Sequence, residues 1–134
     1  MYPTLALVEE KFGAFNALCF EGKLPQPVLK LSHAKTYLGR LTFKKKYSGF
    51  WHRKVELYDF VLRISACYDL PEAVFEDTLI HEMIHYEIAL GQQQDRSAHG
   101  PLFRNRMKEI NDRFGRHIRI SYRLEAVGKP HPLT

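Results

Sequence analysis

Cysteine is scarce in this chain of 134 residues, which contains only Cys19 and Cys67. Two cysteines in helix-like and strand-like surroundings form neither a disulfide framework nor a Cys-x-x-Cys metal knuckle, so we expect two buried or partly buried free thiols. Long apolar runs are also missing, because none approaches the roughly 18 residues of a membrane-spanning helix. The first residues lack the basic start and apolar centre of a secretory signal. A cytoplasmic location without membrane association is therefore expected.

The overall composition is that of an ordinary globular domain, with 45% hydrophobic and 26% charged residues. The length suits one domain with its own core, which we place at residues 1–128, followed by a short tail at residues 129–134. The formal net charge is +5. This surplus is compatible with an acidic partner such as nucleic acid, but charge alone does not establish one.

The spacing of apolar residues predicts an α+β domain in which three main helices pack on a small, mostly antiparallel sheet. The helices are expected at residues 4–22, 71–90 and 100–114, with Thr4 as the N-cap of the first and Gly115 ending the last. Strands are expected at residues 28–32, 38–43 and 118–122. A stretch at residues 50–65 is too long for one ordinary strand, and its alternation slips near Asp59, which predicts either two strands or a bulge. The lysine-rich residues 44–49 are expected to form the turn before it.

The chemistry is concentrated in the second helix, which carries the run His81-Glu82-Met83-Ile84-His85. Two histidines four apart on a helix differ by about 40° around the axis and about 6 Å along it, so both rings can reach one ion. Glu82 follows the first histidine directly, as expected of the general base in a zinc hydrolase. This helix is largely apolar, and an ionisable trio on it would be costly to bury without a purpose.

A catalytic zinc site usually takes three protein ligands, and two residues compete for the third position. His99 lies 14 positions after His85, across a polar loop and immediately before the third helix. Glu109 lies 24 positions after His85 and would give a site of two histidines and one glutamate. We favour His99, because Glu109 stands in a basic stretch where an exposed ion pair is the usual outcome. The metzincin spacing is excluded, since positions 88 and 91 are isoleucine and glycine.

Two further roles remain open at this stage. Asp95, four residues before His99, could hydrogen-bond a ligand histidine and fix its tautomer, or it could make a local bond to the loop backbone. A group that stabilises the oxyanion is expected, and Tyr86, Arg116 and Tyr122 are equally defensible.

These motifs together resemble those of the SprT-like zinc metalloproteases, the group that includes Spartan. The central run from Asp77 to His85 and the later run His99-Gly100-Pro101-Leu102-Phe103 carry the resemblance. Three shorter segments agree with the family's pattern and extend the resemblance over nearly the whole chain: residues 20–25, 38–40 and 115–118. Relatives commonly carry a cysteine-rich zinc ribbon after this domain, and no such cysteines follow here.

The resemblance implies a compact zincin-like domain with one Zn²⁺ on His81, His85 and His99 and with Glu82 as the catalytic residue. It implies a zinc metalloendopeptidase that hydrolyses protein or peptide substrates, with DNA-associated or DNA-crosslinked proteins among them. The alternative is a non-catalytic, zinc-stabilised module that binds nucleic acid or protein. Glu82 favours the enzyme, because a purely structural zinc site has no use for a carboxylate beside it.

A second cluster mixes positive charge with aromatic rings, as proteins that bind single-stranded nucleic acid do. Its candidate DNA-contacting residues are Lys44, Lys45, Lys46, Trp51, Arg53 and Lys54. Lysines that protect the edge of a hairpin from pairing give the same pattern. Only the family resemblance favours the nucleic-acid interpretation, which would make the protein DNA- or nucleoid-associated within the cytoplasm.

Overall fold

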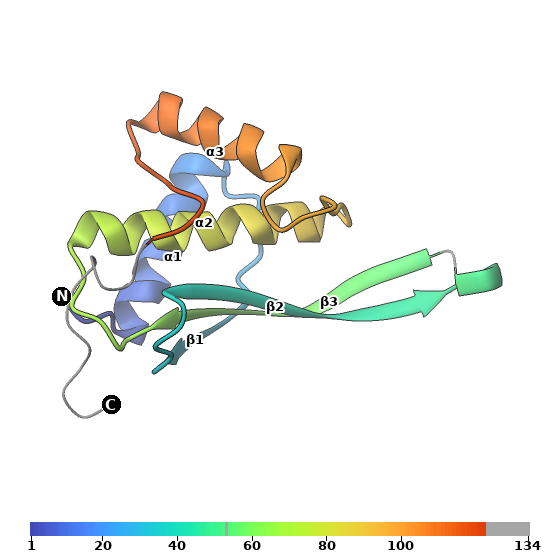
Figure 1. Cartoon of the computed structure of the whole chain (residues 1–134), viewed down its shortest axis with the longest axis horizontal. Coiled ribbons are helices and arrows are strands. Elements are labelled where there is room, and N and C mark those ends of the chain that lie inside the picture. The colour runs from blue at the N-terminus through green and yellow to red at the C-terminus, as the bar shows by residue number, and fades with distance from the viewer. Residues whose placement is uncertain (53, 123–134) are drawn as a thin grey trace.

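The computed structural model describes residues 1–52 and 54–122. Their elements follow the order α1 (Leu5–Cys19), β1 (Val28–Ser32), β2 (Gly39–Ser48), the 3-10 turn η1 (Phe50–His52), β3 (Lys54–Ser65), α2 (Glu72–Leu90) and α3 (Pro101–Phe114). The class is α+β, as predicted. The helix α2 runs along one side of the sheet, α3 lies on the far side of α2, and α1 crosses behind it (Figure 1). This arrangement makes α2 the buried centre of the domain.

The sheet has three strands in the order β1-β3-β2 and is mixed. The strand β1 pairs in parallel with β3 from Val28↔Val61 to Ser32↔Ser65. The longer pairing is antiparallel and joins β2 to β3 from Gly39↔Ile64 to Ser48↔Lys54. Since β1 covers only the second half of β3, the first half of β3 and its partner in β2 form a two-stranded hairpin. It projects beyond the C-terminal end of α2 (Figure 1).

The predicted turn at residues 44–49 is wrong, because β2 continues through these lysines to Ser48. Lysine has a low intrinsic preference for strands, but cross-strand pairing outweighs that preference when the partner strand is adjacent. The chain reverses only at Gly49, with a φ of 85°, and in η1. The predicted bulge near Asp59 is confirmed: Asp59 and Phe60 face the single residue Phe43, and Asp59 has a φ of 54°.

The three helices lie where the sequence predicts them. The backbone N–H of Leu7 donates to the side chain of Thr4 over 3.2 Å, which confirms the N-cap of α1. Gly115 ends α3 with a φ of 64°. The predicted strand at 118–122 is wrong, because no strand forms among residues 116–122. The backbone N–H and carbonyl of Ile118 instead pair with the side-chain amide of Asn111, over 2.8 and 3.0 Å. The predicted tail at 129–134 lies outside the described residues.

The core lies between the sheet and the helices, and α2 supplies more of its buried apolar side chains than any other element. Cys19 and Cys67 are buried and form no disulfide, as predicted. The Arg106 guanidinium joins the three helices, since it donates to the Glu87 carboxylate of α2 over 2.8 Å and to the Cys19 carbonyl of α1 over 2.9 Å. Within residues 1–52 and 54–122, no helix has both the length and the apolar character needed to cross a bilayer.

Candidate metal centre

The structure brings the three predicted histidine ligands together. His81 and His85 lie one turn apart on α2, and His99 reaches them from the loop between α2 and α3. The three Nε2 atoms form a nearly equilateral triangle, at 3.2 Å for His81 and His85, 3.3 Å for His85 and His99, and 3.2 Å for His81 and His99. Ligand nitrogens at 2.0–2.1 Å from a tetrahedral ion lie about 3.3 Å from one another. The three side chains could therefore hold one metal ion.

Glu109, the alternative third ligand, lies elsewhere. It is exposed on α3, and its carboxylate accepts a 2.8 Å bond from Arg106. This is the surface ion pair that its basic surroundings predict.

Partial or full burial favours the neutral form of all three imidazoles. Burial lowers the pKa of His81 to about 4 and that of His85 to about 3, and it also lowers the pKa of His99. A neutral ring with a free lone pair is the form that binds a metal. In His81 the Nδ1–H donates to the carbonyl of Arg119 over 2.8 Å, which leaves Nε2 with its lone pair directed at the triangle. The segment after α3 therefore orients one of the three rings.

Phe103 packs against the rings of all three histidines. Its ring is fully buried, and its centroid lies 4.7 Å from that of His81, 4.5 Å from that of His85 and 4.8 Å from that of His99. The sequence pattern predicts Phe103 on the apolar face of the third helix but does not indicate its contact with the three histidines. The available signal was its position four residues after His99 at the start of that helix.

Glu82 lies beside the triangle and is buried. Its Oε2 is 3.7 Å from Nε2 of His81, and its side chain is 8% exposed. Burial raises the pKa of Glu82 to about 8, and a hydrogen bond from the backbone N–H of Leu41 lowers it in part. The strand β2 can approach α2 closely at Glu82 because position 39 is glycine. A Cβ at this position would lie 2.9 Å from Cγ of Glu82 and 3.0 Å from Cγ2 of Thr78.

Asp95 acts on the loop that carries His99. Its Oδ1 accepts a 3.0 Å bond from the Leu102 N–H and its Oδ2 a 3.1 Å bond from the Phe103 N–H, at the N-terminus of α3. The carboxylate therefore satisfies two free helix amides and interacts favourably with the helix dipole. Of the two roles open at the sequence level, this local backbone bond is the one that the structure shows. Gly100 is close against it, since a Cβ there would lie 2.7 Å from Cγ of Asp95.

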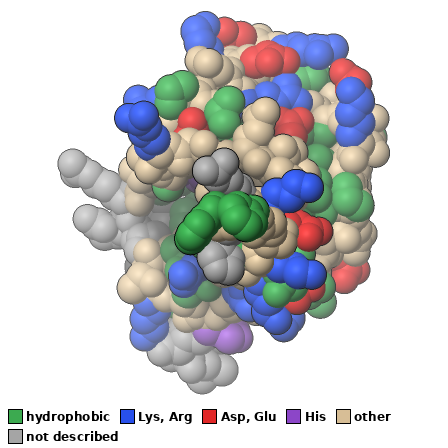
Figure 2. All heavy atoms as spheres, turned by 90° about the vertical axis from the view of Figure 1, so that its right-hand side faces the viewer, with side chains coloured by type: hydrophobic (Ala, Val, Ile, Leu, Met, Phe, Trp, Pro, Cys, Tyr) green, Lys and Arg blue, Asp and Glu red, His purple; other side chains and the backbone are tan. Residues whose placement is uncertain are grey.

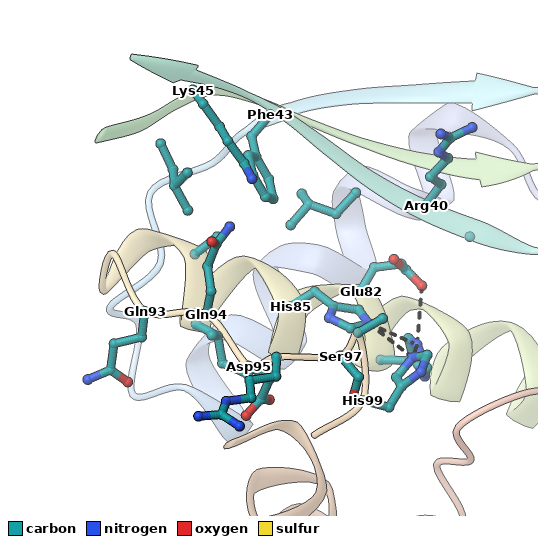
Figure 3. A pocket seen from close by; sticks show the side chains of 18 residues that line it. Arg40, Phe43, Lys45, Glu82, His85, Gln93, Gln94, Asp95, Ser97 and His99 are labelled. Atoms are coloured by element: carbon teal, nitrogen blue, oxygen red, sulfur yellow. Dashed lines mark hydrogen bonds and ion pairs between the residues drawn. The ribbon is translucent and has the colours of Figure 1, made fainter. Parts of the chain in front are cut away.

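The three histidines and Glu82 line a cleft of about 590 Å³ between β2, α2 and the loop that follows α2. Figure 3 shows Glu82, His85 and His99 converging at one end of this cleft, while Phe43 and Lys45 extend into it from β2. None of the three oxyanion candidates lines the cleft within the described residues. Tyr86 donates to the Pro25 carbonyl over 2.7 Å, and Arg116 is paired with Asp77 over 2.7 Å. Tyr122 packs against the hydrophobic core.

The candidate nucleic-acid residues lie on the projecting hairpin. Their side chains are exposed on β2, η1 and β3, and they comprise Lys44, Lys45, Lys46, Trp51 and Lys54. Arg53 lies outside the described residues.

A His-Glu-x-x-His helix, a third histidine from a separate loop and an open cleft beside them define a metalloprotease type of site. A model of the SprT-like family matches residues 8–124, which is most of the chain. The chain belongs to the SprT-like family, whose members are generally of the zinc metalloprotease type. None of the curated proteins compared with the chain matches it.

Proposed function

We propose that this protein is a zinc-dependent endopeptidase in which His81, His85 and His99 hold the ion and Glu82 is the general base. The observation that carries the proposal is the triangle of Nε2 atoms with the Glu82 carboxylate 3.7 Å from one of its corners. Zinc fits the donor set, because it favours three imidazoles and a tetrahedral geometry in catalytic sites. When bound, such an ion polarises a carbonyl group and lowers the pKa of water to about 7.

The chain's own groups supply the proton transfers. Glu82 accepts a proton from the attacking water and then donates it to the leaving amine of the scissile peptide bond. Its buried position suits this exchange, because burial raises the pKa of its carboxyl toward the pH at which it works. Leu41 donates its backbone N–H to the carboxylate, and Gly39 leaves room for it, so the side chain has a fixed orientation.

The test compares wild type with Glu82→Gln for metal content and for cleavage of an unfolded protein. We expect one zinc per chain in both proteins, with cleavage only by wild type. Loss of zinc from the variant would contradict the role of Glu82 as a base, because Glu82 would then be part of the metal site. Absence of cleavage by zinc-loaded wild type would favour the alternative, a non-catalytic module that uses zinc for stability.

We extend the proposal to substrates that are associated with DNA. The support is the hairpin, which carries exposed lysines and the exposed ring of Trp51, a combination suited to phosphates and stacked bases. The test is the cleavage rate of one protein substrate free and crosslinked to single-stranded DNA, at two salt concentrations. We expect faster cleavage of the crosslinked form, and the difference should shrink at the higher salt. Equal rates at both salt concentrations would contradict this extension.

A further inference from the structure

The hairpin formed by Lys44–Tyr58 holds half of the large hydrophobic side chains that are exposed in the described part of the chain. They are Tyr47, Phe50, Trp51, Val55 and Tyr58, and at the tip Phe50 is 81% and Trp51 76% exposed. In Figure 2 the tip faces the viewer, with hydrophobic side chains in front and Lys and Arg side chains around them. Trp51 also has a φ of 63°, a conformation that costs energy for a residue with a side chain. Concentrated apolar exposure of this kind marks an interaction surface.

The strand register divides the hairpin into two sides. Residues that pair directly across two strands point to the same side, and successive pairs alternate. Lys45 pairs with Leu57, and both line the cleft. The next pair on that side is Tyr47 with Val55, at 56% and 42% exposure. We call these four residues the cleft side of the hairpin.

The opposite, outer side has a different character. Its cross-strand pairs are Lys44 with Tyr58, Lys46 with Glu56 and Ser48 with Lys54. Lys44 also makes a 3.2 Å ion pair with Asp59. The outer side is therefore mainly charged and carries both signs, whereas the cleft side is apolar with one cation. We assign the nucleic-acid contact proposed above to Lys44, Lys46 and Lys54 of the outer side and to Trp51 at the tip, because Lys45 lies on the cleft side.

The cleft side is continuous with the candidate metal centre. From Leu41, whose N–H bonds Glu82, the strand β2 passes Phe43 and Lys45 and reaches Tyr47. Six residues of strand cover about 20 Å. The hairpin is also attached to the end of α2, because the Gln92 side chain accepts a 2.7 Å bond from the Leu57 N–H and donates a 3.3 Å bond to the Leu57 carbonyl. A polypeptide leaving the site along β2 would meet a fixed surface.

We propose that the cleft side of the hairpin is an exosite for the polypeptide substrate, about six residues from the scissile bond, and that it favours apolar side chains together with an acidic one. The inference rests on the proposed protease function and specifies its substrate class. Tyr47 and Val55 bury apolar substrate side chains, and the Lys45 ammonium, which extends into the cleft, attracts a carboxylate (Figure 3). Extended chain spans about 3.3–3.6 Å per residue, so only a substrate with at least six residues beyond the cleaved bond reaches Tyr47.

The test uses two fluorogenic peptides with the same central sequence. One has about six residues and ends before the exosite, and the other has about twenty, with leucine, phenylalanine and glutamate on both flanks. In Tyr47→Ser/Val55→Ser we expect the ratio of KM for the long peptide to KM for the short peptide to rise about tenfold. The matched control is Tyr58→Ser on the outer side, which should leave that ratio at the wild-type value. In Lys45→Glu, peptides with lysine in place of glutamate on the flanks should become the better substrates.

A measurement of peptide binding without cleavage distinguishes failure of the exosite from failure of the proposed protease function. The zinc-loaded Glu82→Gln protein is titrated with the labelled long peptide, and fluorescence anisotropy gives Kd without turnover. If wild type cleaves neither peptide, the protease proposal fails, while a tenfold rise in Kd on adding Tyr47→Ser/Val55→Ser would still support the exosite. An unchanged Kd, or an equal loss in Tyr58→Ser, overturns the exosite. Displacement of the peptide from the cleft side by a single-stranded oligonucleotide also overturns it, since nucleic acid would then be the occupant.

Discussion

Replacement of Gly39 by alanine tests how the Glu82 carboxylate, the proposed general base, is positioned. The φ of Gly39 is not among the positive values found in the described residues, so space alone excludes a side chain. An alanine Cβ would lie 2.9 Å from Cγ of Glu82, whereas carbon atoms in good contact are about 3.5 Å apart or more. Since α2 is buried on most of its surface, the Glu82 side chain or β2 must retreat by about 0.6 Å.

The expected effects on activity and stability can be measured separately. Misplacement by 1 Å can cost about a hundredfold in rate, so we expect kcat of Gly39→Ala to fall by about tenfold to a hundredfold. Overpacking should lower the free energy of unfolding by about 1–3 kcal/mol. Zinc content should stay at one ion per chain.

The matched control is Gly13→Ala in α1. A Cβ at Gly13 has no neighbour within 4 Å, so this change should raise the free energy of unfolding by about 0.5–1 kcal/mol without altering kcat. Steady-state peptide cleavage and urea unfolding would check both variants. Wild-type kcat and stability in Gly39→Ala would refute the argument that this glycine makes room for Glu82.

Four further predictions concern the metal centre and its loop. His99→Ala should lower zinc affinity by more than about a hundredfold, because a hundredfold is the upper limit for mutating a residue that only supports a ligand. Glu109→Gln should leave zinc affinity unchanged, and competition with a chelator measures both variants. In metal-free protein, the folded-state pKa of His81, about 4, lies below its unfolded value, so the contribution of His81 to the free energy of unfolding should fall by about 3 kcal/mol as the pH drops from 6.5 to 4. The folded-state pKa of Glu82, about 8, lies above its unfolded value, so the contribution of Glu82 to the free energy of unfolding should be lost as the pH rises from 4.5 to 8. Glu82→Gln should abolish this loss, as measured by urea unfolding with chelator present. Asp95→Ala should lower the free energy of unfolding by about 1 kcal/mol, and Asp95→Asn by less, in the same assay.

The sequence predicts the candidate site better than the sheet, because the site depends on local spacing. His81 and His85 are neighbours on any helix, and the helix itself is marked by a long apolar pattern. His99 is harder to predict, since its approach depends on the path of a loop. That path follows from the bond between Asp95 and the start of α3, which the aspartate's position suggested only as one of two roles.

The wrong predictions concern residues whose secondary structure depends on partners that are distant in the sequence. Residues 44–48 look like a turn, but cross-strand pairing to β3 makes them a strand. Residues 118–122 alternate like a strand, but the Asn111 side chain satisfies the backbone of Ile118. The close approach of Gly39 to Glu82 joins positions 43 residues apart, and nothing in the local sequence around either residue indicates it.

The loop between α2 and α3 is fastened at two points, by Gln92 to β3 and by Asp95 to α3. Because neither hydrogen bond involves the ion, we expect the His99 imidazole to stay near the other two without it, and much of the entropy of closing the loop to be lost during folding and not during metal binding. Metal exchange should then proceed without unfolding, at a rate set by ligand exchange and access through the cleft. A protein built in this way can lose its ion to a chelator and regain it repeatedly with its fold intact.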